Sequence, residues 1–316
     1  MSHEVEQMAY VGQVPWHGLG FNINPASSIE EWQHAAGLNW EVNKRPVQYG
    51  TDGMHSAPVL SFKDKFVLAR TTDDLPYAVV SGRYKPVQPK QILEFFRSLV
   101  ADFGMTIETA GSLRDGKRVW ALAKTGDAHK VMGVDQVNSY LMLATSYDLT
   151  FSTLAQFTSV RVVCNNTLQQ SFKSHTGRVT IPHFRDFSMD DVKSELGVGR
   201  EQWNAYATML DSMAAIKLDT VKANEVLGKV FELTNDPLKD SVNKQHIAKV
   251  IDLFSGQAIG ADIAGQTGWG LVNSVTEYLD KYKRARNQSN RLDSAWFGDA
   301  FNTKQRAVDE VLLLAA

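Results

Sequence analysis

The pattern of apolar and polar residues changes once along the chain, close to residue 187. Before this point, short segments alternate apolar and polar residues between Gly, Pro and Asp, which is typical of half-buried antiparallel strands. After it, apolar residues recur at every third or fourth position, which indicates amphipathic helices. A run of strands followed by a run of helices predicts the α+β class and argues against an alternating β-α-β sheet.

Two helices interrupt the strands of the first half. Residues 28–37 carry a capping serine and two glutamates in the first turn, as helix capping and the helix dipole favour. Residues 89–104 begin with Pro and repeat apolar residues at helical spacing up to a terminal Gly. Charged turns at Lys63–Lys65 and Arg114–Lys117 are expected to close two hairpins. Residues 1–26 lack either period and predict an ordered, irregular arm, and residues 126–137 predict a loop.

The second half predicts a series of helices separated by polar and glycine-containing breaks. We expect these helices near residues 188–215, 220–232, 243–255, 268–284 and 303–315. The expected architecture is therefore a mostly antiparallel, β-rich N-terminal half with two helices, followed by an all-helical C-terminal half. As domains, residues 1–187 form a β-rich α+β domain with an N-terminal arm, and residues 188–316 form a helical region packed on it.

Composition narrows the class of protein. The 316 residues are 43% hydrophobic and 22% charged, as in ordinary globular proteins, and the net charge is −2. Without an overall basic excess, binding to nucleic acid requires a local basic surface. No apolar stretch approaches the length of a membrane span, and the first residues carry acids instead of an apolar run, so we expect a soluble, cytoplasmic protein without membrane contact.

A basic, aromatic stretch runs from Ser139 to Arg185. After Asp148 it contains no acidic residue until Asp186, and phenylalanines are interleaved with its basic residues. Those basic residues are Arg161, Lys173, Arg178 and Arg185. Cations suit phosphates and flat rings suit bases, so this composition fits a nucleic-acid groove. The alternative is a buried hairpin with a few solvated cations, because core strands are poor in acids in any case.

A second basic cluster lies in the segment YLDKYKRARNQSNRLDSAWFG, residues 278–298. Lys283, Arg284 and Arg286 lie there, close to aromatic residues. One interpretation is a solvated helix end, where cations suit the helix dipole. The other is a further part of a surface that follows a phosphate backbone.

No motif for a specific reaction is present. The chain lacks a GxxxxGK[ST] loop, a GxGxxG turn after a strand, and an HExxH helix. Its only cysteine, Cys164, excludes an internal disulfide and any multi-cysteine metal site, and a buried structural role is the simplest reading. We therefore expect no cofactor, no metal and no catalytic residues, and a binding protein rather than an enzyme.

Several segments together resemble one family. They are VPWHGLG (14–20), VVSGRYKPVQPKQILEFF (79–96), YLMLATSYDLTFSTLAQFTSVRVVCNNTLQ (140–169), TGWGLVNSVTEYLDKYKR (267–284) and RLDSAWFG (291–298). The chain is similar over nearly its whole length to the phage- and plasmid-encoded family catalogued as domain of unknown function 932, "phage/plasmid-like protein". That family often has Ser-His-Asp-Gly where this chain has Ser146, Tyr147, Asp148 and Leu149.

The resemblance implies a mobile-element protein in a bacterial host, with no established reaction. With the basic clusters, it leads us to expect a single-stranded nucleic-acid-binding protein, an accessory in annealing, recombination or replication that works as a homo-oligomer. The candidate nucleic-acid-binding residues are Arg83, Lys85, Arg161, Lys173, Arg178, Arg185, Lys283, Arg284 and Arg286. One alternative is a module that binds and blocks a host defence or replication protein. A second is a Mg²⁺-dependent nuclease that uses Asp148.

Overall fold

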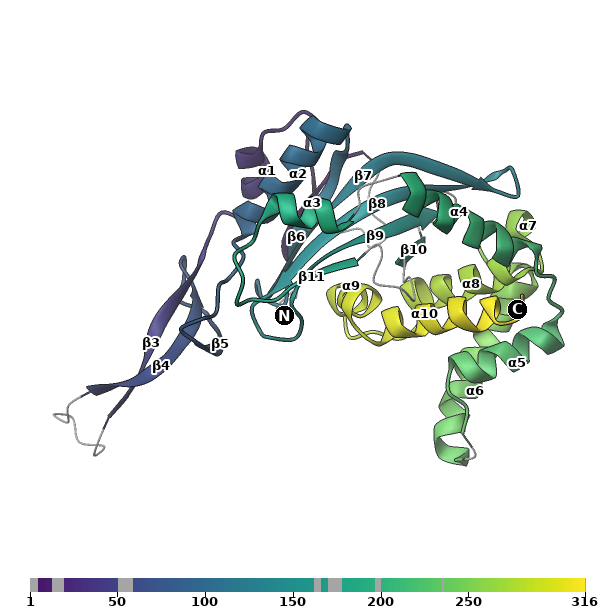
Figure 1. Cartoon of the computed structure of the whole chain (residues 1–316). Coiled ribbons are helices and arrows are strands. Elements are labelled where there is room, and N and C mark those ends of the chain that lie inside the picture. The colour runs from purple at the N-terminus through teal and green to yellow at the C-terminus, as the bar shows by residue number, and fades with distance from the viewer. Residues whose placement is uncertain are drawn as a thin grey trace. The chain divides into compact units, whose positions relative to one another are not determined.

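The computed structural model describes residues 5–12, 20–50, 59–161, 166–169, 178–196, 200–234 and 236–315 (Figure 1). Contacts divide the chain into two compact units, each assembled from separate segments. The first unit contains Met1–Ala123, Leu141–Ala155 and Arg178–Leu196. The second unit contains Lys124–Tyr140, Gln156–Gly177 and Gly197–Ala316.

The α+β class is confirmed, but the predicted all-helical C-terminal half needs correction. Strand residues of Lys124–Tyr140 and Gln156–Gly177 cluster with the C-terminal helices, and the helix at Met189–Leu196 clusters with the first unit. The sequence change near residue 187 therefore marks a switch in secondary structure and not the edge of a compact body.

The larger sheet has eight strands. Its strands are β1 (Val5–Tyr10), β2 (Phe21–Asn22), β6 (Thr106–Leu113), β7 (Arg118–Val131), β8 (Asp135–Ser146), β9 (Thr153–Arg161), β10 (Asn166–Gln169) and β11 (Arg178–Ile181). The order is β10-β9-β8-β7-β6-β1-β2, and β11 pairs with β9. The predicted turn between β6 and β7 is confirmed, because Arg114, Asp115 and Gly116 all have positive φ angles of 55°, 56° and 80°.

Two segments predicted as irregular belong to this sheet. Residues Val5–Tyr10 form β1, which pairs antiparallel with β6 and places Ala9 opposite Ala110. Met8 and Ala9 are fully buried, so apolar burial on β6 specifies the strand although its sequence alternates poorly. The predicted loop at residues 126–137 is instead the end of β7, a short turn and the start of β8.

The smaller sheet contains β3 (Val42–Gly50), β4 (Val59–Arg70) and β5 (Pro76–Ser81), all antiparallel in that order. The predicted hairpin turn at Lys63–Lys65 is wrong, because β4 continues through these residues. Asp64 takes a φ of 56° inside the strand, and the register with β3 shifts there. Its carboxylate accepts a hydrogen bond of 2.9 Å from the Gly82 N–H. The charged residues thus form a bulge. Bulges and hairpin turns have similar residue compositions, which is why the sequence predicted a turn here.

The first unit also contains α1 (Ile29–Ala35), α2 (Pro89–Phe103) and α3 (Met189–Leu196). The first two confirm the predicted helices. Ser28 and Glu31 form a capping box at α1, with hydrogen bonds of 3.2 Å and 2.7 Å in the two directions. The apolar face of α2 is fully buried at Ile92, Phe95 and Phe96, as its helical period predicts.

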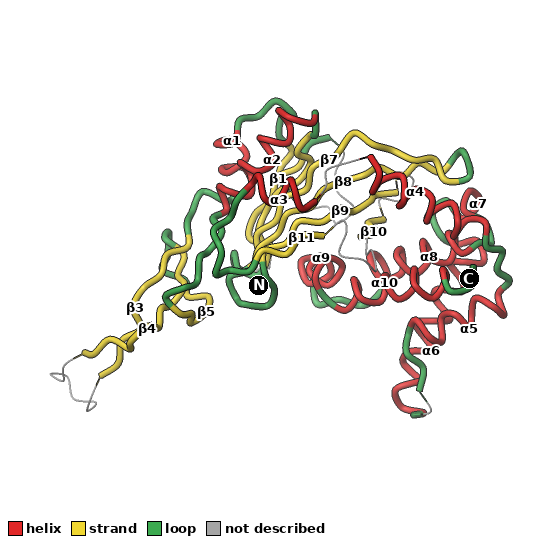
Figure 2. The backbone as a smooth tube through the Cα atoms, viewed as in Figure 1, coloured by secondary structure: helices red, strands yellow, loops and turns green. Residues whose placement is uncertain are grey.

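The second unit is mostly helical, as Figure 2 shows. Its helices are α4 (Arg200–Ala215), α5 (Thr220–Val230), α6 (Pro237–Asp252), α7 (Ala261–Ala264), α8 (Gly268–Glu277), α9 (Gln288–Phe297) and α10 (Asp299–Leu312), with π-helical turns η1 (Leu253–Gln257) and η2 (Tyr278–Tyr282). The sequence predicted a break where α9 forms. Asn287 caps α9 by accepting a 2.8 Å hydrogen bond from the Asn290 N–H.

Helix α8 forms the centre of the second unit, since every one of its residues is buried. It packs against α10 and α4. Several of its polar side chains bond back to its own carbonyls, for example Asn273 to Trp269 at 2.8 Å and Thr276 to Val272 at 2.9 Å. Because these donors are satisfied within α8 itself, the helix can be buried although it contains several polar residues.

None of the helices in the described part of the chain combines the length and the apolar character that crossing a membrane requires.

Candidate functional site

The turn after β8, residues 147–152, lies in one of the segments in which the chain resembles the family named above. Ser146 Oγ donates to the Phe151 carbonyl at 2.6 Å and accepts from the Phe151 N–H at 3.1 Å. The Asp148 carboxylate accepts from both the N–H and the hydroxyl of Thr150, at 3.1 Å and 2.5 Å. The turn is therefore closed by its own side chains.

Arg118 covers the Asp148 side of this turn. Its Nε lies 4.0 Å from Asp148 Oδ2, its Nη2 donates to Thr150 Oγ1 at 3.2 Å, and its guanidinium lies 5.5 Å from the Phe151 ring centroid. The Asp148 carboxylate is thus bound by a cation and a hydroxyl. Among the residues that the structure describes, no group of three or more His, Cys, Asp or Glu side chains is arranged to hold a metal ion. This geometry gives the nuclease alternative no support.

Tyr147 occupies the position where the resembling family often has His, and it is completely buried. Its ring stacks on Tyr77 at 5.6 Å and meets the edge of Trp40 at 5.9 Å. Its hydroxyl donates to the Val87 carbonyl at 2.7 Å. Burial raises the pKa of the Tyr147 phenol well above its usual value, so it stays protonated. In this chain the position is structural.

His183 and Tyr84 stack with ring centroids 4.7 Å apart. The His183 Nε2–H donates to the Phe151 carbonyl at 3.3 Å. Burial lowers the pKa of His183, so the neutral ring is favoured, and the Phe151 hydrogen bond opposes this in part. Burial, and then the charge of Asp148, raises the pKa of Tyr84. Both groups are therefore neutral near pH 7 and act here as packing residues.

Leu149 carries backbone strain in this turn. Its φ is 64°, a left-handed conformation, and its side chain is 50% exposed. Because glycine adopts this conformation without a steric penalty, we expect Leu149→Gly to raise the free energy of unfolding by about 0.5–1 kcal/mol. Urea unfolding of the purified chain measures this change.

Leu313 provides the matched control for Leu149. It is also exposed, at 56%, but its φ is −62°. Leu313→Gly relieves no strain and is expected to leave stability unchanged or lower it. If both glycine substitutions lower the free energy of unfolding by the same amount, the backbone strain at Leu149 makes no measurable contribution to stability.

One of the predicted cations of the first unit, Lys85, is held by an acid. The Lys85 N–H donates to the His183 carbonyl at 2.5 Å, so the segments around these two residues lie side by side. The Lys85 ammonium pairs with Asp186 at 2.6 Å. Arg83 and Arg185 are exposed, as is Phe184. The structure groups these predicted residues, but it neutralises one of them.

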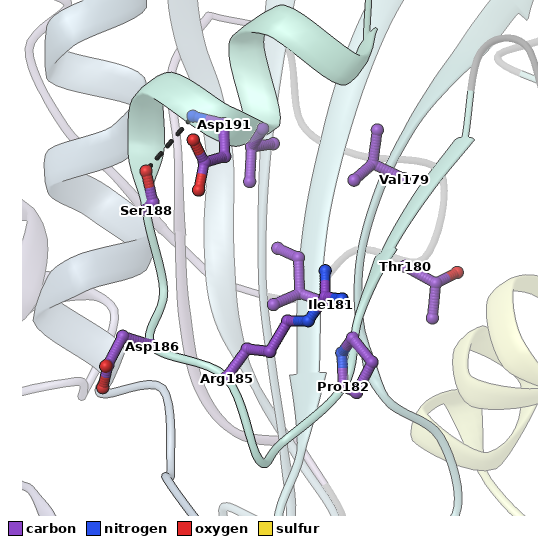
Figure 3. A pocket seen from close by; sticks show the side chains of 9 residues that line it. Val179, Thr180, Ile181, Pro182, Arg185, Asp186, Ser188 and Asp191 are labelled. Carbon is purple, nitrogen blue, oxygen red and sulfur yellow. Dashed lines mark hydrogen bonds between the residues drawn. The ribbon is translucent and has the colours of Figure 1, made fainter.

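A small pocket next to Arg185 has the same mixed character (Figure 3). It is lined by Val179, Thr180, Ile181, Pro182, Arg185, Asp186, Ser188, Asp191 and Val192. Figure 3 shows Ser188 at the start of α3, where its hydroxyl accepts from the Asp191 N–H at 3.2 Å. With Asp186 and Asp191 beside Arg185, the pocket lacks the single sign of charge that a phosphate groove needs.

Part of the predicted set lies outside the described residues. This holds for all of Lys173 and Cys164, and for the side chains of Arg161 and Arg178. The backbones of Arg161 and Arg178 belong to β9 and β11, which pair with each other.

The remaining predicted residues, Lys283, Arg284 and Arg286, belong to the second unit. Together with Lys281 and Tyr282 they form the segment Lys281–Arg286, which we call the basic loop; it runs from the end of η2 toward α9. Arg284 and Arg286 are exposed, and neither forms an ion pair with any described carboxylate.

An aromatic ring with a second cation lies at the start of the basic loop. The Tyr282 ring is 48% exposed, and the Lys249 ammonium of α6 lies 5.5 Å from its centroid. The Tyr282 hydroxyl donates to Glu277 Oε1 at 3.4 Å, which orients the ring. Burial, and then the positive charge of Lys283, lowers the pKa of the nearby His246. The fold thus places Lys249 of α6 over the Tyr282 ring. The local sequence pattern did not reveal this contact, because the two residues are far apart in the chain.

The acids nearest to the basic loop in sequence are occupied inside the unit. Glu277 is 1% exposed and its Oε2 accepts a 2.9 Å hydrogen bond from the Ile259 N–H. Asp280 is also 1% exposed and pairs with Lys304 at 2.6 Å. Both carboxylates are thus withdrawn from the surface, and the exposed arginines keep their positive field.

A model of the family described as "Domain of unknown function (DUF932)" matches residues 76–296. No curated protein and no solved structure shows significant similarity to the chain.

Proposed function

We propose that this chain, which belongs to the DUF932 family, binds single-stranded nucleic acid through the basic loop of its second unit. The observation that carries the proposal is the surface formed by exposed Arg284 and Arg286 next to the half-exposed Tyr282 ring. Cations bind phosphates through charge, and an accessible ring stacks on an unpaired base. A role in annealing, recombination or replication on a phage or plasmid, as a cytoplasmic homo-oligomer, belongs to the same proposal.

The distribution of charge supports a local site. The whole chain carries a net charge of −2, so a general electrostatic attraction to nucleic acid is not expected. The nearby carboxylates of Glu277 and Asp280 are buried in contacts within the second unit. Their burial leaves the basic loop, which contains no acidic residue, as a local positive surface on a molecule that is close to neutral.

Removing the two exposed arginines tests the proposal. Fluorescence anisotropy with a labelled single-stranded oligonucleotide at several salt concentrations gives both affinity and its salt dependence. Each phosphate contact to a single strand contributes about 0.7 to the slope of log K against log salt, so we expect Arg284→Ala/Arg286→Ala to reduce the slope by about 1.4. Tyr282→Ala should weaken binding without changing the slope, because stacking releases no counterions.

The control pair is Lys217→Ala/Lys222→Ala. Both lysines are exposed residues of the second unit outside the basic loop, and the substitution changes the net charge equally. We expect the control to keep the wild-type slope. Equal weakening by the two pairs would mean a diffuse charge effect and overturn the site. No binding by the wild-type chain at low salt would overturn the function, because electrostatic attraction is strongest there.

A further inference from the structure

A second exposed surface lies on the small sheet of the first unit. Residues 59–65 of β4 are all exposed, and so is most of β3 after Val42. Successive strand residues point to opposite faces, so both faces of this hairpin are open to solvent. Strand β5 begins its pairing only at Lys65, and Figure 1 shows β3 and β4 continuing beyond it. We call residues 44–50 and 59–65 the β-arm.

The β-arm presents aromatic rings on one face. Tyr49 lies directly opposite Leu60 in the register, so their side chains share a face. The Phe62 ring meets the Tyr49 ring edge to face, with centroids 6.4 Å apart. The two rings are 49% and 53% exposed. Rings of this size are normally buried, and an exposed pair of them indicates a binding surface.

The charges of the β-arm are mainly positive. Lys44, Arg45, Lys63 and Lys65 are exposed residues of the arm. Its acid, Asp64, accepts a hydrogen bond from the Gly82 N–H at the base of the arm. Arg45 pairs with Asp74 at 2.5 Å, whereas no carboxylate in the described ranges pairs with Lys63 or Lys65. The arm therefore complements an anionic partner that also offers flat apolar faces.

We propose that the β-arm stacks Tyr49 and Phe62 on unpaired bases of a single-stranded nucleic acid, while Lys63 and Lys65 contact its phosphates. An unpaired strand supplies both phosphates and accessible base faces, which a duplex keeps stacked inside. The ligand class rests on the proposed function, but the site belongs to the other unit and is tested separately.

The test combines anisotropy with a single-stranded oligonucleotide that contains 2-aminopurine, whose fluorescence reports stacking. We expect each of Tyr49→Ala and Phe62→Ala to weaken binding by at least about five-fold, to leave the salt slope unchanged and to abolish the 2-aminopurine change. Lys63→Ala/Lys65→Ala should instead reduce the slope by about 1.4. Tyr49→Phe should retain the stacking signal, since it keeps the ring.

Val79→Ala is the control within the same sheet. Val79 is 55% exposed on β5, outside the arm, so its removal should change neither affinity nor fluorescence. Thermal unfolding checks that each variant is folded, which we expect because the substituted side chains are exposed. A duplex of the same sequence should bind more weakly and lose little affinity in the ring variants.

The outcomes separate the two proposals. Wild-type protein that binds no oligonucleotide overturns both. Loss of binding in the Arg284→Ala/Arg286→Ala variant, with wild-type behaviour in the ring variants, overturns the β-arm alone. Loss of oligonucleotide binding in the ring variants, with wild-type binding by the Arg284→Ala/Arg286→Ala variant, supports the β-arm and overturns the basic loop. Ring variants that lose binding to phosphatidylserine vesicles but not to the oligonucleotide identify the arm as a membrane contact and overturn this inference.

Discussion

Lys304→Met is expected to lower the free energy of unfolding by about 3–5 kcal/mol, the cost of leaving a buried charge without its partner. The Lys304 ammonium and the Asp280 carboxylate are 2.6 Å apart, with side chains only 3% and 1% exposed. The substitution keeps the length and apolar stem of the side chain and removes only the charge. Urea unfolding followed by circular dichroism measures the loss.

The double variant Lys304→Met/Asp280→Leu separates the charge from the packing. With both charges removed, no ion is left buried alone, and most of the lost stability should return. Lys222→Met, at an exposed lysine of the same unit, should change stability by less than about 0.5 kcal/mol. A Lys304→Met variant as stable as this control would show that Asp280 is protonated or reaches water in the folded protein.

Tyr147→Ala is expected to cost a similar amount, about 3–5 kcal/mol, because it removes a fully buried ring and leaves a cavity. The ring contacts Tyr77 and Trp40, and its hydroxyl satisfies the Val87 carbonyl. Tyr147→Phe keeps the ring and removes only that donor, so we expect it to cost about 1–3 kcal/mol. Chemical denaturation of both variants divides the total into packing and hydrogen bonding.

Tyr49→Ala is the matched control in the same unit, since its ring is 49% exposed. Its loss should stay below about 1 kcal/mol. If Tyr147→Ala lowers the free energy of unfolding no more than Tyr49→Ala does, the surrounding residues close the cavity. Stability then does not require a large ring at position 147.

Local patterns in the sequence predicted much of the fold. Helices α1 and α2 and the turn at Arg114–Gly116 follow from capping, period and turn residues that neighbours in sequence determine. Helix α9 was missed although Leu292, Ala295 and Trp296 are its buried apolar residues at helical spacing. Its short apolar stripe lies among polar residues, and the helix is stabilised by packing that the sequence does not display.

Non-local pairing explains the other differences. Strand β1 is specified by its partner β6, and the Lys63–Lys65 segment forms a bulge because β3 continues to pair on both sides of it. Composition does not distinguish a bulge from a turn, since both need residues that accept a positive φ. The division into units depends on contacts between distant segments, which no local window contains.

The sequence also predicted only part of the candidate site. The sequence identified Arg284 and Arg286, but it also placed Glu277 and Asp280 close by, and only the fold shows that these carboxylates are buried. In the first unit the effect is opposite, because the fold brings Asp186 against Lys85. The β-arm was not found because its rings alternate with polar residues, as in any half-buried strand.

The interleaved segments of the two units constrain the order in which the chain can fold during its synthesis. The first unit is complete only when Leu196 has left the ribosome. By then residues 124–140 of the second unit are already outside, including Val131 and Val137, whose core partners lie in helices that are still to be made. Apolar residues that wait for late partners favour aggregation, so we expect the nascent chain to depend on chaperones.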